Sequence, residues 1–299
     1  MQNVRVTRKG KRPPIPCRLF FILARKKAVG VIFRRGPSKW VELVRWNLVT
    51  DEFSSGQWFH GRIYERRCDL SPDGSLLIYF CSKINARTLK DQEYTKSWTA
   101  ISHPPYLTAL ALWPKGDCWH GGGLFEDERT VWLNHKADSA KPHPKHIPKK
   151  LKIRSNPDAH GEDAPIYSIR LERDGWKCLQ EWKYINHGYP KMLETVQPEI
   201  REKALRGRPW IKLRLIRSIS GLDYCEEFSI ADEINHCAVA LTRASWADWD
   251  RRSRLVFARD GKIFASQIED VGVLVERELV DLNSAKPEAI PAPYWARKW

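Results

Sequence analysis

The feature that most constrains the fold of this chain is a recurring pattern of short strand, tight turn and short strand. The clearest copy surrounds Ser71–Gly74, where Pro72 and the Asp-Gly pair after it favour a sharp reversal between two strands. Similar turns surround Gly116, Gly175 and Gly261, and each follows a run rich in β-branched and aromatic residues. The pattern predicts an all-β protein with few helices.

The spacing of these turns gives the expected architecture. The four turn glycines are separated by 42, 59 and 86 residues. The first interval is about the length of one β-propeller blade and the last is close to two blades. The middle interval contains a segment rich in lysine, histidine and proline, residues 135–165, which we interpret as a basic loop inserted into a blade. We therefore predict a β-propeller of roughly five to seven antiparallel blades.

Local patterns add further elements. The runs 18–24, 28–34 and 40–46 predict three consecutive antiparallel strands. The run 167–171 before Gly175 is also expected to be a strand. A short helix is expected over 198–206, where glutamate and lysine follow a proline in favourable order, and 230–242 fits either helix or strand.

The domain organisation follows from where apolar residues begin. Residues 1–16 are basic, contain three prolines near their end and offer little to bury, so we expect a disordered arm. The 14 tryptophans are spread from Trp40 to Trp299. One core built along residues 17–299 accounts for that spread, and a single domain is expected there.

The turn segments also carry a resemblance. Residues 68–77 and 254–264 resemble the inner hairpin of β-propeller blades, in which a strand ends at a Ser-Pro-Asp-Gly or Asp-Gly turn. The stretch from Arg34 to the region of Trp132 resembles a family of bacterial proteins of uncharacterised function. These resemblances imply a propeller architecture and no particular chemistry, since propellers serve as enzymes, scaffolds and ligand binders.

The cellular setting is suggested by two properties of the chain. No stretch approaches the roughly 18 consecutive apolar residues of a membrane helix, and the run 19–24 is too short for a secretory signal. The seven cysteines are odd in number and irregularly spaced, so we expect no disulfide framework and mostly buried thiols. A cytoplasmic protein without membrane contact is expected.

The net charge of +15 is concentrated in three segments. Lysine and arginine outnumber aspartate and glutamate by 12 to 0 in residues 1–41, by 7 to 1 in 136–154 and by 7 to 1 in 201–217. Local basic segments suit a nucleic acid or an acidic protein surface. Solvated loops and a flexible tail are the structural alternative.

Within these segments we select candidates for binding an anionic partner, some of which are interleaved with aromatic residues that could stack on unpaired bases. The selected residues are Arg8, Lys9, Lys11, Arg12, Arg34, Arg35, Lys39, Lys145, Lys149, Lys150, Arg206, Arg208 and Arg214.

Signals for catalysis and cofactors are weaker than their structural alternatives. Residues 120–123, His-Gly-Gly-Gly, resemble the oxyanion-hole loop of some esterases, but the chain has no Gly-x-Ser-x-Gly element. Asp248 and Asp250 could pair as acid and base, yet a turn with structural ion pairs is the favoured interpretation. Histidines in 135–160 lie among lysines that would repel a cation, so an exposed basic loop is expected there. No catalytic residue, metal or cofactor is predicted.

Three functions remain after this reading. The leading hypothesis is a non-enzymatic scaffold that holds a protein partner within a multi-component bacterial system. The second is a nucleic-acid-binding subunit that uses the basic segments, with binding that weakens steeply as salt rises. The third is a hydrolase in the central channel that uses His120 with Asp248 or Asp250.

Overall fold

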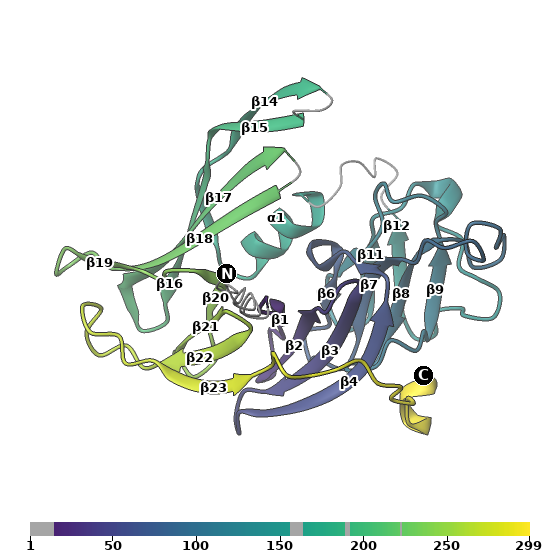
Figure 1. The fold of residues 1–299 in the computed structure, drawn as a ribbon, viewed down its shortest axis with the longest axis horizontal. Coiled ribbons are helices and arrows are strands. Elements are labelled where there is room, and N and C mark those ends of the chain that lie inside the picture. The colour runs from purple at the N-terminus through teal and green to yellow at the C-terminus, as the bar shows by residue number, and fades with distance from the viewer. Residues whose placement is uncertain (1–14, 156–163, 189–191, 222) are drawn as a thin grey trace, which may run out of the picture.

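The computed structural model describes residues 15–155, 164–188, 192–221 and 223–299. The protein is all-β, with 49% strand and 7% helix, and one of its sheets curls into a half-barrel (Figure 1). Strand pairing is antiparallel except between the last two strands of the third sheet. The fold class predicted from the turns is therefore confirmed at this level. The predicted arm, residues 1–16, lies outside the described residues except for its last two positions.

The first two sheets are built from the first 114 residues. Sheet 1 is an antiparallel meander in chain order: β1 (Arg18–Leu23), β2 (Val29–Arg35), β3 (Trp40–Asn47) and β4 (Glu52–His60). The three strands predicted at the start of the fold are confirmed. Sheet 2 follows, with a short 3-10 helix, η1 (Glu65–Arg67), in its first connection: β5 (Arg62–Ile63), β6 (Asp69–Leu70), β7 (Leu77–Ser82), β8 (Ser97–Ser102) and β9 (Ala111–Pro114).

The third sheet and a helix come next. Sheet 3 is small and contains η2 in the connection before its last strand: β10 (Gly123–Phe125), β11 (Thr130–Leu133), η2 (Ala137–Ser139) and β12 (Lys152–Ser155). Helix α1 (Ala164–Arg173) is the α-helix of the described residues. The segment 135–165 therefore holds β12, which pairs in parallel with β11, and the start of α1. It is not a simple inserted loop.

The remaining chain forms two further sheets. Sheet 4 has seven strands that run as long hairpins: β13 (Lys177–Gln180), β14 (Lys183–Gly188), β15 (Met192–Gln197), β16 (Glu199–Leu205), β17 (Arg208–Gly221), β18 (Asp223–Asp232) and β19 (Cys237–Ala240). Sheet 5 is a four-stranded meander followed by a terminal 3-10 helix: β20 (Ala244–Trp249), β21 (Leu255–Arg259), β22 (Lys262–Ser266), β23 (Arg277–Asp281) and η3 (Tyr294–Arg297). We call sheets 1, 2, 3 and 5 the body, and β14 with β15 the ribbon.

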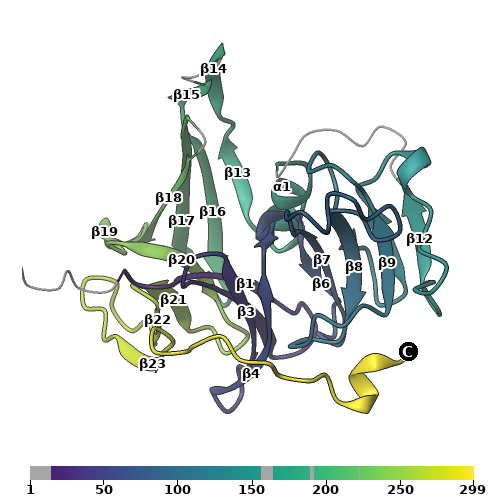
Figure 2. The same cartoon turned by 45° about the vertical axis from the view of Figure 1, so that its right-hand side comes forward.

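The sheets contact one another in a closed series. Strand β1 packs against β20 of sheet 5 on one side and against β6 of sheet 2 on the other, and β6 packs against β10 of sheet 3. Helix α1 contacts both β10 and β13, and β18 returns to β20. In Figure 2, β1 lies near the middle of the molecule, while the ribbon projects away from the body.

The apolar sequence of β1 explains its central position. Phe21 stacks on Trp246 of sheet 5 with ring centroids 4.1 Å apart, whereas its neighbour Ile22 joins the core shared with sheet 2. Successive side chains of a strand point to opposite faces, so a strand buried on both faces has an uninterrupted apolar run. Residues 19–23 are such a run, and burying it removes apolar surface from water at about 25 cal/mol per Å².

Two predicted elements differ from the structure. Residues 167–171 lie in α1 instead of a strand, because Tyr167, Arg170 and Leu171 recur at helical spacing and bury one face. Gly175, at φ 95°, is the turn residue that follows this helix. Residues 199–205 form β16 instead of a helix, because they pair along their length with β17. The ambiguous run 230–242 is strand, in β18 and β19.

The four turns do not occupy equivalent positions in the fold. Their spacing is therefore not evidence for repeated propeller blades. The turns at Gly74 and Gly261 close the β6–β7 and β21–β22 hairpins as predicted. Gly116 lies in the connection from sheet 2 to sheet 3, and Gly175 follows a helix. The sheets of the described residues also differ in size, from three strands to seven. A propeller of five to seven blades is not confirmed.

Candidate functional site

A cavity of about 500 Å³ opens where sheet 1, sheet 4, sheet 5 and α1 meet. Its walls come from β1 and the turn after it, from the end of α1, from β16 to β18 and from β20. Ligand cavities in proteins are usually about 300–1,000 Å³ and often lie where structural units meet. The cavity is therefore the candidate functional site of the described residues.

Charged side chains are abundant in its lining, and positive charges predominate. Three carboxylates line the cavity: Asp174, Asp248 and Asp250. Seven cationic side chains line it: Arg25, Lys27, Arg170, Arg173, Lys203, Arg206 and Arg251. A cluster of cations beside apolar walls focuses a positive potential, so the charge balance of the cavity favours an anion.

Two of the carboxylates are neutralised by neighbouring cations of the same cavity. Arg173 Nε lies 2.9 Å from Asp174 Oδ1, and the same guanidinium also holds Asp69 at 2.6 Å. Lys203 Nζ lies 2.6 Å from Asp248 Oδ1. Burial nevertheless raises the pKa of Asp248. These pairs cancel most of the negative charge in the wall.

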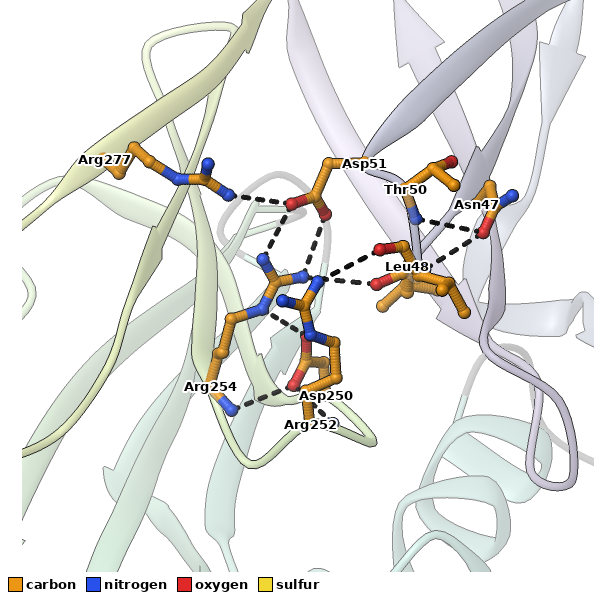
Figure 3. A network of polar contacts seen from close by, with 9 residues as sticks. Asn47, Leu48, Thr50, Asp51, Asp250, Arg252, Arg254 and Arg277 are labelled. Atoms are coloured by element: carbon orange, nitrogen blue, oxygen red, sulfur yellow. Dashed lines mark hydrogen bonds and ion pairs between the residues drawn. The ribbon is translucent and has the colours of Figure 1, made fainter.

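The third carboxylate belongs to a network that joins sheet 5 to sheet 1 (Figure 3). Arg254 Nε donates to Asp250 at 2.7 Å, and its two terminal nitrogens reach both oxygens of Asp51 at 2.7 and 2.9 Å. Arg277 donates to Asp51 as well, at 2.8 Å. The predicted turn with structural ion pairs is thus present at Asp250.

Four of the lining cations have no carboxylate within ion-pair distance among the described residues: Arg25, Lys27, Arg206 and Arg251. Arg25 is the most enclosed of them. Its Nη2 donates to the carbonyls of Phe125 at 2.8 Å and Glu126 at 3.2 Å, while its buried Nε bonds no atom of the described residues. Burial, followed by the positive charge of Arg173, lowers the pKa of Arg25.

A fifth cation, Arg170, is held inside the wall. It donates to the carbonyl oxygen of Cys68, and its guanidinium carbon lies 5.4 Å from the Phe20 ring and 5.2 Å from the Tyr167 ring. Burial lowers the pKa of Arg170. Aromatic faces and carbonyl oxygens reduce the cost of burying this cation without cancelling its charge.

Of the three selected residues of the first segment that the structure describes, two are held in internal bonds. Arg34 is buried and donates to the backbone carbonyls of Leu282, Gly36 and residues near them. Arg35 donates to the carbonyl of Ile63 and pairs with Glu65. Lys39 is exposed in the β2–β3 turn. The remaining candidates of that segment, Arg8, Lys9, Lys11 and Arg12, lie outside the described residues.

The candidates of the second basic segment include both exposed and ion-paired side chains. Lys149 and Lys150 are exposed just before β12, whereas Lys145 pairs with Glu93. The side of the molecule that carries β12 is opposite the side that carries β16 (Figures 1 and 2).

Of the third segment, one selected residue reaches the cavity. Arg206 lines it, while Arg208 donates to the carbonyl of Ile268 and Arg214 pairs with Glu202. The first and third segments therefore meet at the cavity through Arg25, Lys27, Lys203 and Arg206, of which only Arg206 was selected from the sequence. The others carried no signal beyond lying in basic runs.

The elements considered for hydrolysis serve structural roles. In the His-Gly-Gly-Gly run, the amide of Gly121 donates to the Asn134 carbonyl and that of Gly122 to Thr99 Oγ1, both at 2.9 Å or less. These donors are not available to a developing oxyanion. Asp248 and Asp250 are each held by a cation. The glycines instead allow a close backbone approach, because a Cβ at Gly122 would lie 1.9 Å from the Arg67 carbonyl oxygen.

The histidines of the 135–165 segment are more buried than the sequence suggested. His135 is fully buried, with one ring nitrogen 2.8 Å from Thr99 Oγ1 and the other 2.8 Å from the Ser139 carbonyl. His143 is buried against the Tyr94 ring. The expectation of an exposed loop is wrong for these two residues. Among the described residues, no group of three or more His, Cys, Asp or Glu side chains could hold a metal ion.

Comparisons with known proteins do not add a function. No protein-family model matches the chain, and no curated protein matches it significantly. None of the helices in the described parts of the chain has the length and apolar character needed to cross a membrane. All seven cysteines lie in those parts and none forms a disulfide. Cys17, Cys68 and Cys81 are buried, which is fewer than expected.

Proposed function

We propose that the chain is a non-enzymatic interaction subunit, a ring-like β scaffold that holds a protein partner within a multi-component system in the cytoplasm. The closed series of contacts through β20, β1, β6, β10, α1 and sheet 4 supports an incomplete propeller as its architecture. The internal bonding of the candidate catalytic groups supports the absence of enzyme chemistry.

The observation that carries this proposal is the ribbon. It projects beyond the body in both views (Figures 1 and 2). Strand β14 lies at the edge of sheet 4, where β15 is its one strand neighbour among the described residues, and all six of its residues are exposed. Tyr184, Ile185 and Val196 present apolar side chains to solvent there. An exposed edge strand with apolar side chains can pair with an extended segment of another protein.

The partner is therefore an extended protein segment that adds a strand beside β14. Main-chain hydrogen bonds along the edge supply affinity, and alternate side chains supply specificity. The single hydrogen-bonded side of β14 leaves the other side of its backbone open for this pairing.

Capture of a partner from cells of the source organism tests the proposal. The wild-type chain should co-purify a stoichiometric partner, and Ile185→Lys should lose most of it, because an edge lysine opposes strand addition. Ile185 lies opposite Glu194 in the ribbon, so the new lysine has an acidic neighbour and the ribbon should remain folded.

The matched control is Val275→Lys, which replaces another exposed aliphatic residue outside the ribbon. It should retain the partner. Equal retention by Ile185→Lys and Val275→Lys, or the lack of any stoichiometric partner with the wild-type chain, would contradict the proposal.

The nucleic-acid alternative has one observation in its favour. Two of the three basic segments meet at the cavity, through Arg25 and Lys27 from the first and Lys203 and Arg206 from the third. The segment before β12 lies on the opposite side of the molecule (Figures 1 and 2). A continuous basic groove along a strand of nucleic acid would need all three to converge. The cavity therefore favours one localised anionic group.

A further inference from the structure

The cavity keeps a net positive charge after the ion pairs of its three carboxylates are taken into account. Asp174, Asp248 and Asp250 are each held by a cation within 2.9 Å. Arg25 and Arg251 nevertheless remain without a carboxylate partner among the described residues, as do Lys27 and Arg206. Uncompensated cations around one cavity repel one another, and a bound anion relieves that repulsion.

Arg25 has the geometry of an anchor for such an anion. Two backbone carbonyls hold its Nη2, which fixes the plane of the guanidinium. Its Nε is buried in the described structure without a hydrogen-bond partner, a state that costs free energy unless a ligand atom accepts the bond. Arg251 is tied to the same place, because its Nη1 donates to the Arg25 carbonyl at 2.7 Å.

The remaining two cations are free to adjust. Lys27 and Arg206 are exposed, and neither side chain forms a hydrogen bond within the parts of the chain that the structure describes. They come from the β1–β2 turn and the β16–β17 turn, so they approach the cavity from different sheets. Cations from separate elements can surround a tetrahedral anion, whereas one carboxylate is satisfied by a single guanidinium.

We propose that this cavity binds the phosphate group of a small phosphate ester, with Arg25 as the anchor and Lys27, Arg206 and Arg251 as its neighbours. The fork of guanidinium donors matches phosphate oxygens, and lysine adds an adjustable point charge. The volume of about 500 Å³ exceeds what an inorganic phosphate fills, so the rest of the ligand lies against the apolar wall that includes Leu48 and Leu215.

Titration calorimetry on the full chain tests this assignment with named probes. Ribose 5-phosphate and adenosine 5′-monophosphate should both bind saturably, and inorganic phosphate should compete with them. Ribose and adenosine, which lack the phosphate, should not bind. The affinity should fall as salt is raised, because the exposed cations of the mouth are screened.

Variants distinguish a defined phosphate site from non-specific attraction of anions to a positively charged surface. The double change Lys27→Ala with Arg206→Ala removes two side chains that bond nothing in the described structure, so it should leave folding intact and weaken binding by about tenfold to a hundredfold. Arg25→Lys keeps the charge but loses the unpaired Nε donor and should weaken binding by about tenfold. Arg87→Ala, which removes an exposed arginine outside the cavity, is the matched control and should bind as the wild type does.

Three results would overturn the assignment: no saturable binding of either ester by the folded chain, unchanged affinity in the double variant, or binding of a single-stranded oligonucleotide without binding of the esters. The last result would restore the nucleic-acid alternative. Ile185→Lys lies in the ribbon and should leave ester affinity unchanged, so this inference and the partner proposal can fail separately.

Discussion

The body and the ribbon use the same antiparallel strands in opposite ways. In β2 of the body, five of seven residues are buried and the last, Arg35, is held by Ile63 and Glu65 of sheet 2 and its first connection. In β14 of the ribbon, every residue is exposed, and its histidine pairs with Glu194 across the hairpin in solvent. Polar side chains therefore have two roles in this protein. In the body, buried charged side chains join neighbouring sheets. In the ribbon, the polar side chains are exposed and the strand stays accessible to solvent.

The largest expected effect comes from the Arg254 network of the body. Arg254→Ala removes the shared partner of Asp250, which is fully buried, and Asp51, which is mostly buried. Leaving Asp250 without its cation, and Asp51 with Arg277 alone, should lower the free energy of unfolding by about 3–5 kcal/mol. Denaturant unfolding followed by tryptophan fluorescence measures the loss.

Sheet 4 supplies the matched control for that experiment. Arg214 pairs with Glu202 between β17 and β16, but its side chain is 45% exposed. Arg214→Ala should cost about 1 kcal/mol or less. Equal losses of unfolding free energy for Arg254→Ala and Arg214→Ala would show that the buried ion pairs of the body stabilise the protein no more than an exposed pair of sheet 4.

A second test uses the buried histidine of the body. Burial lowers the pKa of His135 from 6.5 to about 4. The folded chain therefore excludes a proton that the unfolded chain accepts. The contribution of this residue to stability is fully present above pH 6.5 and is lost as pH falls toward 4.

The loss from His135 should reach about 3 kcal/mol over that range. Unfolding curves measured from pH 7 to pH 4 should show it, and His135→Gln, which cannot take up the proton, should flatten the decline. A decline of the same size in His135→Gln would show that burial of His135 is not its cause. Titration of the His135 ring by NMR gives the pKa directly.

The sequence was informative wherever local chemistry determines structure. The Ser71–Gly74 turn and the run 18–24 predicted a hairpin and a strand, because turn residues and strand-forming residues act through neighbouring positions. Residues 167–171 were misassigned, because apolar and polar side chains alternate along this short segment as they do in a strand, yet it is helical. Tertiary pairing with β17 overrode the helical preference of residues 199–205.

The candidate cavity could not be predicted in the same way. Its wall combines Arg25 from the β1–β2 turn with Arg206 and Arg251 from sheets 4 and 5, positions far apart in the chain. The basic runs indicated an anionic partner but could not distinguish Arg34, which is buried in bonds to backbone carbonyls, from Arg25, which keeps an unpaired donor. That distinction depends on which acceptors the fold places beside each guanidinium.

The smallest of these effects compares two glycines that share one backbone conformation. Gly122 of the body has φ 77° and Gly207, in the β16–β17 turn, has φ 82°. A Cβ at Gly122 would lie 1.9 Å from the Arg67 carbonyl oxygen, whereas a Cβ at Gly207 would meet nothing within 4 Å. Substitution by alanine at either position adds the left-handed strain of about 1–2 kcal/mol. Gly122→Ala should lower the free energy of unfolding by about 1–3 kcal/mol more than Gly207→Ala does. The reason is that the backbone around Arg67 must shift to make room for the new Cβ, whereas nothing has to shift at Gly207. Denaturant unfolding of the two variants side by side measures the difference, and identical costs would show that sheets 2 and 3 are less tightly packed at this point than their contacts indicate.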